Sequence, residues 1–302
     1  MRPFSTAIAF AIGPILASLA LCGAALAQPP YRLPVVATFS ILADLARNVG
    51  GERIEVSALV GPNGDAHVYQ PTPADGKSLG AARLILANGL GLEGWIDRLI
   101  KASGAEAPVI VATKGVSPRE MEEKGHIGED PHAWQSVANA KIYVGNVRDG
   151  LIAVDPEGAA GYRANAEAYL AKLDVLETEI AAAIAKIPPD RRKIITTHDA
   201  FGYFGAAYGV QFVAPQGVST ETEASARDVA KIIRQIKAEK IPAVFLENIS
   251  DPRVGRRIAE ESGAKIGGAL FSDALSPPDG LAPTYIDMMR NNVRELCAAL
   301  GK

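Results

Sequence analysis

Short apolar segments alternate with amphipathic segments along most of the chain. Apolar or alternating runs predict strands, and runs with apolar positions three and four apart predict helices. In the first half, strands are expected at 34–38, 53–60, 83–87 and 109–113, and helices at 41–49, 74–81 and 136–152. In the second half, strands are expected at 193–197, 211–214, 243–246 and 265–268, and helices at 225–238, 251–262 and 284–300. This alternation predicts an α/β fold with mainly parallel sheets.

The longest regular pattern runs from Pro156 to Ile187 and predicts one continuous helix. Its apolar stripe consists of Tyr162, Ala166, Tyr169, Leu173, Leu176, Ile180, Ile184 and Ile187. Asp155 suits the N-cap and Pro156 the first helical position. A helix of that length spans about 48 Å, which is too long for one small lobe. We therefore expect two α/β lobes, at 28–155 and 188–302, joined by a linking helix at 156–187.

The first 27 residues differ from the rest of the chain. Arg2 provides a positive start, residues 7–21 are mostly apolar, and Ala25-Leu26-Ala27 matches a small-x-small cleavage site. This pattern predicts a signal peptide at 1–27, a mature chain that starts near Gln28, and export to the periplasm. A lipoprotein would use Cys22 instead, but Leu21 is large for the position before a lipidated cysteine.

Composition narrows the possible partners. The formal net charge is −3 over 302 residues, so no basic surface indicates a nucleic-acid partner. No later segment approaches the ~18 apolar residues of a membrane span, so we expect no stable membrane insertion. We also expect a monomer. Beyond the signal peptide the sequence has one cysteine, Cys297, which we expect to be a small buried residue of the last helix.

Four residues share one context along the chain. His67, His132, His198 and Asp273 each lie in a loop after a strand or at a strand end, two before the linking helix and two after it. Ligands of open α/β sheets bind beyond the carboxyl ends of the strands, so two facing lobes would bring these side chains to one cleft. Three imidazoles and a carboxylate suit a divalent transition metal, zinc above all. We expect these four residues to bind the metal.

Neighbouring residues are expected to support this site. Pro131 stiffens the backbone that presents His132. Asp65 and Asp130 could orient imidazoles, although turn and cap duties explain them as well. Residues 114–129 are expected to form a polar loop in which His126 is solvated.

The chain resembles the periplasmic zinc- and manganese-binding receptors of ABC transporters, whose two lobes are joined by one long helix. The matching segments are 64–73, 130–134, 196–204, 219–228 and 271–275, in the family's order. The resemblance implies that His67, His132, His198 and Asp273 are the metal ligands. It also implies that the protein delivers its metal ion to a membrane permease with its ATPase.

The resemblance leaves the metal open between Zn²⁺ and Mn²⁺. Manganese-type members tend to carry a carboxylate at the third ligand, where this chain has His198, so zinc is expected. Many zinc-type members also carry a long loop rich in histidine before the Asp-Pro-His motif, and 114–129 is short with only His126. A zinc-dependent hydrolase is the alternative from another class, but catalytic zinc keeps a position for water and four ligands leave none. We expect that the protein is not an enzyme and has no catalytic residues. A surface adhesin is a third hypothesis for the function.

Overall fold

Two four-stranded parallel sheets form the framework of the molecule. A computed structural model describes residues 32–123 and 126–301, and the expectations for the signal peptide and Cys22 lie outside these ranges. Within them, Arg32 and the residues that follow form one compact unit. The fold class predicted from the sequence, with two parallel sheets and one long helix, is confirmed.

The first sheet has the strand order β2-β1-β3-β4, and all of its pairs are parallel. Its strands are β1 (Leu33–Phe39), β2 (Ile54–Val60), β3 (Leu84–Ala87) and β4 (Val109–Val111). The helices of this half are α1 (Ser40–Gly50), α2 (Pro73–Ala81), α3 (Ile96–Ser103) and α4 (Val137–Val154). Thr72 and Asp75 form a capping box that starts α2. The sequence pattern did not reveal α3.

The second sheet repeats this plan with the order β10-β9-β7-β8. Its strands are β7 (Lys193–Ile195), β8 (Gln211–Val213), β9 (Ala243–Glu247) and β10 (Lys265–Leu270). The helices are α6 (Gly202–Tyr208), α7 (Ala226–Glu239), α8 (Pro252–Ser262) and α9 (Tyr285–Leu300). Short 3-10 turns stand at Gly51–Arg53, Ala133–Gln135, Pro156–Gly158 and Pro189–Arg191. We call the halves that contain the first and second sheets the N-terminal and C-terminal lobes.

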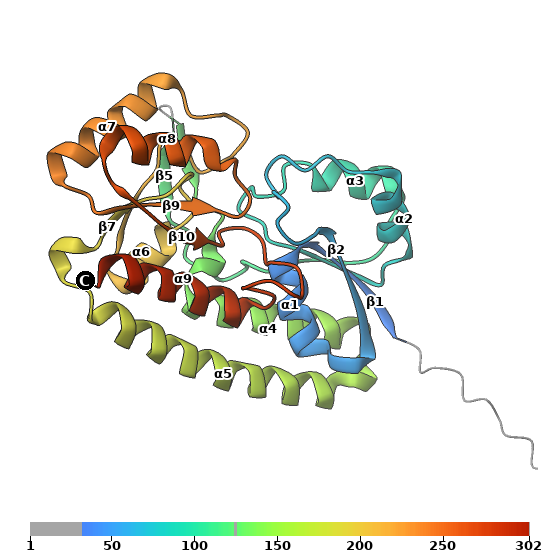
Figure 1. The fold of residues 1–302 in the computed structure, drawn as a ribbon. Coiled ribbons are helices and arrows are strands. Elements are labelled where there is room, and N and C mark those ends of the chain that lie inside the picture. Colours follow the sequence, from blue (N-terminus) through green and yellow to red (C-terminus); the bar gives the residue numbers. More distant parts are fainter. Residues whose placement is uncertain (1–31, 124–125, 302) are drawn as a thin grey trace, which may run out of the picture. The chain divides into compact units, whose positions relative to one another are not determined.

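Helix α5 (Ala159–Ala185) runs along both lobes, as Figure 1 shows. Its predicted apolar stripe is buried at every position, so the inward face is confirmed. The helix has 27 residues and is shorter than expected, because Pro156–Gly158 form a separate 3-10 turn before it. Asp155 does not cap α5: its carboxylate pairs with Arg53 at 2.8 Å and accepts the hydroxyl proton of Tyr162 at 2.5 Å.

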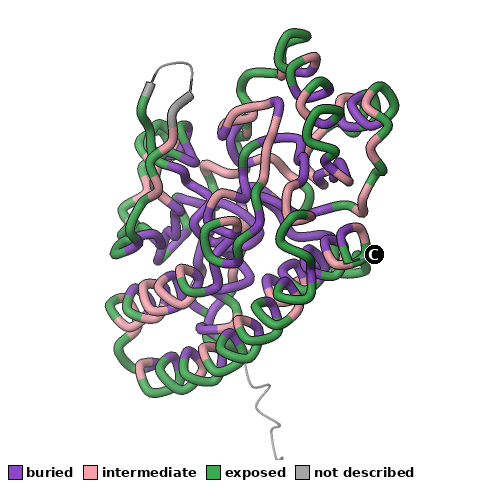
Figure 2. Tube along the Cα trace, turned by 90° about the vertical axis from the view of Figure 1, so that its left-hand side faces the viewer, coloured by how far each residue is buried: buried purple, intermediate pink, exposed green. Residues whose placement is uncertain are grey.

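The lobes share a continuous core beside α5. One cluster of buried residues includes both sheets and helices α1, α4, α5 and α9, and Figure 2 shows buried positions running through the interior. Hydrogen bonds cross between the lobes in the same region: Trp134 Nε1 and Gln135 Nε2 both donate to the carbonyl of Ser272, at 2.9 and 2.7 Å. The hydroxyl of Tyr285 donates to the Trp134 carbonyl at 2.7 Å. The lobes are therefore joined by packing and hydrogen bonds as well as by the helix.

Residues 114–129 are not a simple loop, so that expectation was wrong. They contain an antiparallel hairpin of β5 (Glu120–Glu123) and β6 (His126–Glu129). The backbone N–H of Asp130 donates to the Arg119 carbonyl at 2.9 Å and closes the base of the hairpin. The segment has little apolar alternation, and Ile127 is 78% exposed, so cross-strand pairing rather than burial defines these strands. The expectation for the His126 side chain lies outside what the structure describes.

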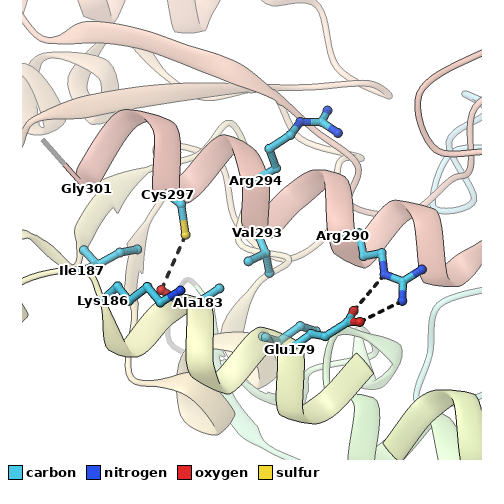
Figure 3. A pocket seen from close by; sticks show the side chains of 10 residues that line it. Glu179, Ala183, Lys186, Ile187, Arg290, Val293, Arg294, Cys297 and Gly301 are labelled. Atoms are coloured by element: carbon cyan, nitrogen blue, oxygen red, sulfur yellow. Dashed lines mark hydrogen bonds and ion pairs between the residues drawn. The ribbon is translucent and has the colours of Figure 1, made fainter. Parts of the chain in front are cut away.

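Cys297 is only partly buried, which corrects the expectation of a core residue. It faces a groove of about 400 Å³ between α5 and α9, drawn in Figure 3. The thiol lies 3.7 Å from the Ala183 carbonyl, and an ion pair between Arg290 and Glu179 spans the two helices in the same groove.

None of the helices in the described ranges has the length and apolar character needed to cross a membrane.

Candidate metal centre

The four residues predicted from the sequence converge on one point between the lobes. His67 follows β2, and His132 precedes the 3-10 turn that leads into α4. His198 follows β7 and Asp273 follows β10. One nitrogen of each histidine and one oxygen of Asp273 all lie within 4.8 Å of one another. The structure thus brings together every residue of the predicted set.

The spacing of these atoms suits a single ion. Nε2 of His67 lies 3.2 Å from Nε2 of His132 and 3.3 Å from Oδ2 of Asp273. Nε2 of His198 lies 3.2 Å from the same oxygen, and Nε2 of His132 lies 3.5 Å from Oδ1 of Asp273. Donors bound to zinc at about 2.0–2.1 Å in a tetrahedron stand about 3.3–3.4 Å apart. These four separations match those of zinc ligands, and all four donor atoms lie within 4.8 Å of one another.

Burial also favours a bound cation at this point. His132, His198 and Asp273 are fully buried, and His67 is 7% exposed. Oδ1 of Asp273 has no hydrogen-bond partner among the described residues. A buried carboxylate oxygen without a donor is costly unless an ion or water satisfies it. The donor set and the unsatisfied oxygen together fit a divalent metal ion.

Two carboxylates contact the Nδ1 atoms of two of the imidazoles, on the side of each ring away from the cluster. Oδ1 of Asp130 lies 2.9 Å from Nδ1 of His132 and also accepts the His132 backbone N–H at 3.0 Å. Oε2 of Glu247 lies 2.6 Å from Nδ1 of His198, an ion-pair contact without the alignment of a hydrogen bond. The other oxygen of Glu247 accepts the backbone N–H groups of Thr197 and His198, at 2.7 and 2.9 Å. Carboxylates in this position fix the ring orientation and raise the basicity of metal-binding histidines.

Glu247 was not predicted from the sequence. It is the last residue of β9, and it is 4% exposed. A signal did exist, because an acidic residue directly follows the apolar strand predicted at 243–246, at the same edge of the sheet as His198 and Asp273.

Asp65 and Asp130, the two aspartates considered as partners of the imidazoles, make different contacts. Asp130 orients an imidazole, as described above. The hydrogen bonds of Asp65 go elsewhere than to the His67 ring: its carboxylate accepts the His67 backbone N–H at 2.9 Å and the Thr220 hydroxyl at 2.6 Å. Asp65 therefore shapes the turn that carries His67 and ties this turn to the C-terminal lobe.

The charges at the centre are strongly coupled. Burial opposes protonation of His132, but the carboxylates of Asp273 and Asp130 outweigh it and raise the pKa of His132 to about 9. Burial likewise opposes protonation of His198, yet Glu247 and Asp273 hold its pKa well above the ordinary value. Burial would raise the pKa of Asp273, but His198 and His132 keep it well below its usual range. A metal ion must therefore displace protons from these imidazoles when it binds.

One hollow connects the centre with the surface. It has a volume of about 300 Å³, and its walls include His67, Met121, Glu129, Val218 and Glu221. Of the four converging residues, His67 is the one that lines it. The hollow lies between the hairpin on one side and the loop at 218–221 on the other, and it gives the site an opening.

Comparison with known proteins places the chain in a family. The model of the family described as "Zinc-uptake complex component A periplasmic" matches residues 35–299. The chain belongs to this family. The chain is also similar to the iron-binding protein YfeA of Yersinia pestis, with 34% identity over 90% of this chain and 87% of YfeA. The manganese-binding lipoprotein MntA of Halalkalibacterium halodurans is 35% identical over 89% of each chain.

Solved structures agree with this placement. The periplasmic zinc binding protein TroA of Treponema pallidum is 31% identical, with a TM-score of 0.85 over 90% of this chain and all of TroA. A manganese-bound periplasmic metal binding protein from candidatus Liberibacter asiaticus is 31% identical, with a TM-score of 0.80 over 89% of this chain and all of that one.

These findings confirm the resemblance seen in the sequence. The protein is a metal-binding receptor of the ABC-transporter type, within a family of solute-binding proteins. The names of its relatives include iron, manganese and zinc, so the choice of metal depends on the chemistry of the site.

Proposed function

We propose that the protein captures Zn²⁺ in the periplasm and delivers it to a membrane permease with its ATPase. The observation that carries this proposal is the buried cluster of three imidazole nitrogens and one carboxylate oxygen, which all lie within 4.8 Å of one another. We infer that His67, His132, His198 and Asp273 are the ligands. The metal is the cargo of the receptor rather than a catalytic group.

The donor set favours zinc over manganese. Three imidazoles and one carboxylate are a borderline-soft set, whereas Mn²⁺ suits a site richer in oxygen donors. The imidazole of His198, at the third ligand position, is the feature that favours zinc over manganese. Manganese remains the alternative cargo, since relatives at 32–35% identity carry that metal in their names.

A zinc-dependent hydrolase is less well supported by the same geometry. Catalytic zinc keeps one coordination position for water, and four protein donors complete a tetrahedron. Three of the four side chains are fully buried, and of the four only His67 lines the hollow that opens to the surface. These features support a role in binding and transport without catalysis.

Competition between metals tests the proposal. The mature protein, stripped by a chelator, is offered equimolar Zn²⁺ and Mn²⁺ and examined by native mass spectrometry. We expect one zinc ion per chain, with loss or weakening of binding in His198→Ala. The matched control is His126→Ala, the histidine outside the proposed ligand set, which should bind like the wild type.

The possible outcomes separate the hypotheses. A preference for manganese would keep the receptor role and overturn the argument from donor softness. Stoichiometric zinc that survives in His198→Ala would remove His198 from the ligand set. Absence of any stoichiometric metal would overturn the proposed function.

A further inference from the structure

Gly202, the first residue of α6, leaves room for a side chain from the other lobe. A Cβ atom built at this position would overlap Nη1 of Arg119 and would stand 2.7 Å from Oδ2 of Asp130. Gly202 is not among the residues with positive φ, so its backbone conformation does not require glycine. The close approach of the Arg119 guanidinium is therefore the structural reason for a glycine here.

The guanidinium reaches the carboxylate that orients a proposed metal ligand. Nη1 of Arg119 lies 3.5 Å from Oδ2 of Asp130. The other oxygen of Asp130, Oδ1, contacts Nδ1 of the His132 ring and accepts the His132 backbone N–H. Asp130 is 4% exposed. A buried carboxylate that loses one of its charged partners is left poorly compensated. Arg119 thus acts on His132 through Asp130.

Tyr203 completes the contact from the C-terminal lobe. Its hydroxyl accepts the backbone N–H of Arg119 at 3.0 Å and donates to the carbonyl of Asp130 at 3.0 Å. The guanidinium of Arg119 lies 5.6 Å from the centre of the Tyr203 ring, a distance at which cation–π attraction operates. Two consecutive residues of α6, Gly202 and Tyr203, therefore contact both residues at the base of the hairpin.

We propose that Arg119, Gly202 and Tyr203 form a positioning clamp that holds the His132 imidazole in place for metal binding. The clamp crosses between the lobes, so a shift of α6 away from the hairpin base would release Asp130 and loosen His132. Its consequence is a slow release of metal while the lobes stay together. This inference rests on the proposed function, since it acts through one of the proposed ligands.

Release kinetics test the clamp. Zinc-loaded protein is mixed with an excess of a fluorescent chelator, and the rate of zinc loss is recorded. We expect Arg119→Ala and Gly202→Ala each to raise the dissociation rate by roughly tenfold, the size of effect seen when a group that orients a metal ligand is lost. The double variant should be no faster than the faster single variant, because both changes remove the same contact. The control is Gly161→Ala, a helical glycine of α5 with open space around it.

A second readout separates positioning from general damage. Cobalt(II) bound in place of zinc has visible absorption bands that depend on ligand geometry, so these bands should shift in Arg119→Ala and in Gly202→Ala. A purely structural role would lower the melting temperature and leave the bands unchanged. If Gly202→Ala fails to fold, Arg119→Ala and Tyr203→Phe carry the test alone.

The outcomes keep the clamp and the function distinct. Wild-type protein that holds zinc, with unchanged release rates and unchanged cobalt bands in the variants, would overturn the clamp alone. Additive effects in the double variant would show that Gly202 does not act through Arg119. Wild-type protein that holds no zinc would overturn the proposed function and the clamp with it.

Discussion

Nδ1 of His198 lies 2.6 Å from Oε2 of Glu247, and both side chains are fully buried. The two residues come from the ends of neighbouring strands, β7 and β9, of the C-terminal sheet. The contact turns Nε2 of His198 toward the other proposed ligands, and the two backbone N–H groups bound to Glu247 fix the loop that carries His198. Glu247 therefore sets both the direction and the position of this imidazole.

Removing the charge of Glu247 should weaken metal binding without removing a ligand. Glu247→Gln keeps the size of the side chain but loses the carboxylate that supports His198. We expect zinc affinity to fall roughly 10- to 100-fold, as is typical for partners of metal-binding histidines. Competition against a chromophoric chelator measures it. The matched control is Glu261→Gln on the exposed face of α8, where the carboxylate pairs with Arg257. Equal affinities in the two variants would contradict the role given to Glu247.

Metal binding should stabilise the fold, because the donors come from both lobes and converge only in the native state. With free zinc a thousandfold above the dissociation constant, the free energy of unfolding should rise by about 4 kcal/mol. For a domain of this size the melting temperature should rise by roughly 8–16 °C. Differential scanning fluorimetry with and without chelator measures the shift. A chelator-treated sample whose melting temperature does not change on adding zinc would refute the prediction.

Most of the helices and strands could be predicted from the sequence because the apolar residues that they bury recur at regular intervals. The stripe from Tyr162 to Ile184 along α5 and the parallel strands could be read from apolar periodicity alone. The four converging residues could be found because each follows a strand and belongs to a side-chain type that binds metals. Their segments also matched a known family in the correct order, which made the set specific.

What could not be predicted depends on contacts between distant segments. Glu247 gains its role from a partner 49 positions away, and its own segment indicates the edge of the sheet where it lies but not the contact with His198. The hairpin of β5 and β6 has little apolar alternation in its sequence and exists through cross-strand pairing. Gly202 has ordinary backbone angles, so only the approach of Arg119 explains it. Such features follow from the assembled lobes rather than from local propensity.

The interior of α5 should be sensitive to truncation where it faces the core. Leu173 is fully buried near the middle of the helix, whereas Val175 is 54% exposed two residues later. We expect Leu173→Ala to lower the free energy of unfolding by about 2–5 kcal/mol through lost contacts and a cavity. Val175→Ala, the matched control, should change it by less than about 0.5 kcal/mol. Urea unfolding of the metal-free protein measures both, and equal effects would show that α5 does not anchor the core at this point.

A buried carboxylate at the lobe junction should make stability depend on pH. Asp44 of α1 accepts the backbone N–H of Tyr285, the first residue of α9, at 2.9 Å. Burial raises the pKa of Asp44 to about 6, although the Tyr285 N–H and Arg47 oppose this. Because the folded pKa lies above the unfolded value near 3.9, ionisation costs more in the folded state. The contribution of Asp44 to stability is therefore largest below about pH 4 and is lost as pH rises through 6.

The variant Asp44→Asn tests this dependence. The difference between the folded and unfolded pKa corresponds to roughly 3 kcal/mol above pH 6. Asparagine can still accept the Tyr285 N–H, so we expect the variant to be at least as stable as the wild type at pH 7. The stability difference between the two proteins should shrink as pH falls from 6 to 4, as measured by urea unfolding at each pH. A difference that stays constant over this range would contradict the assignment to Asp44.

The contact between His198 and Glu247 also predicts how metal preference can be changed. Replacing the imidazole with a carboxylate, His198→Glu, supplies the harder oxygen donor that suits Mn²⁺. In the wild-type background, however, the new carboxylate would face Glu247 in a fully buried site, and two like charges there repel. We therefore expect His198→Glu alone to bind zinc and manganese poorly.

The double variant His198→Glu with Glu247→Gln should recover binding and shift the preference toward manganese, because the amide of glutamine can donate to the new carboxylate. Native mass spectrometry with both metals in equal amounts compares the single and double variants. Glu247→Gln alone is the control, since it keeps all three imidazoles and should keep its preference for zinc. If the single variant His198→Glu binds manganese as well as the double variant does, Glu247 does not restrict the chemistry of the third ligand.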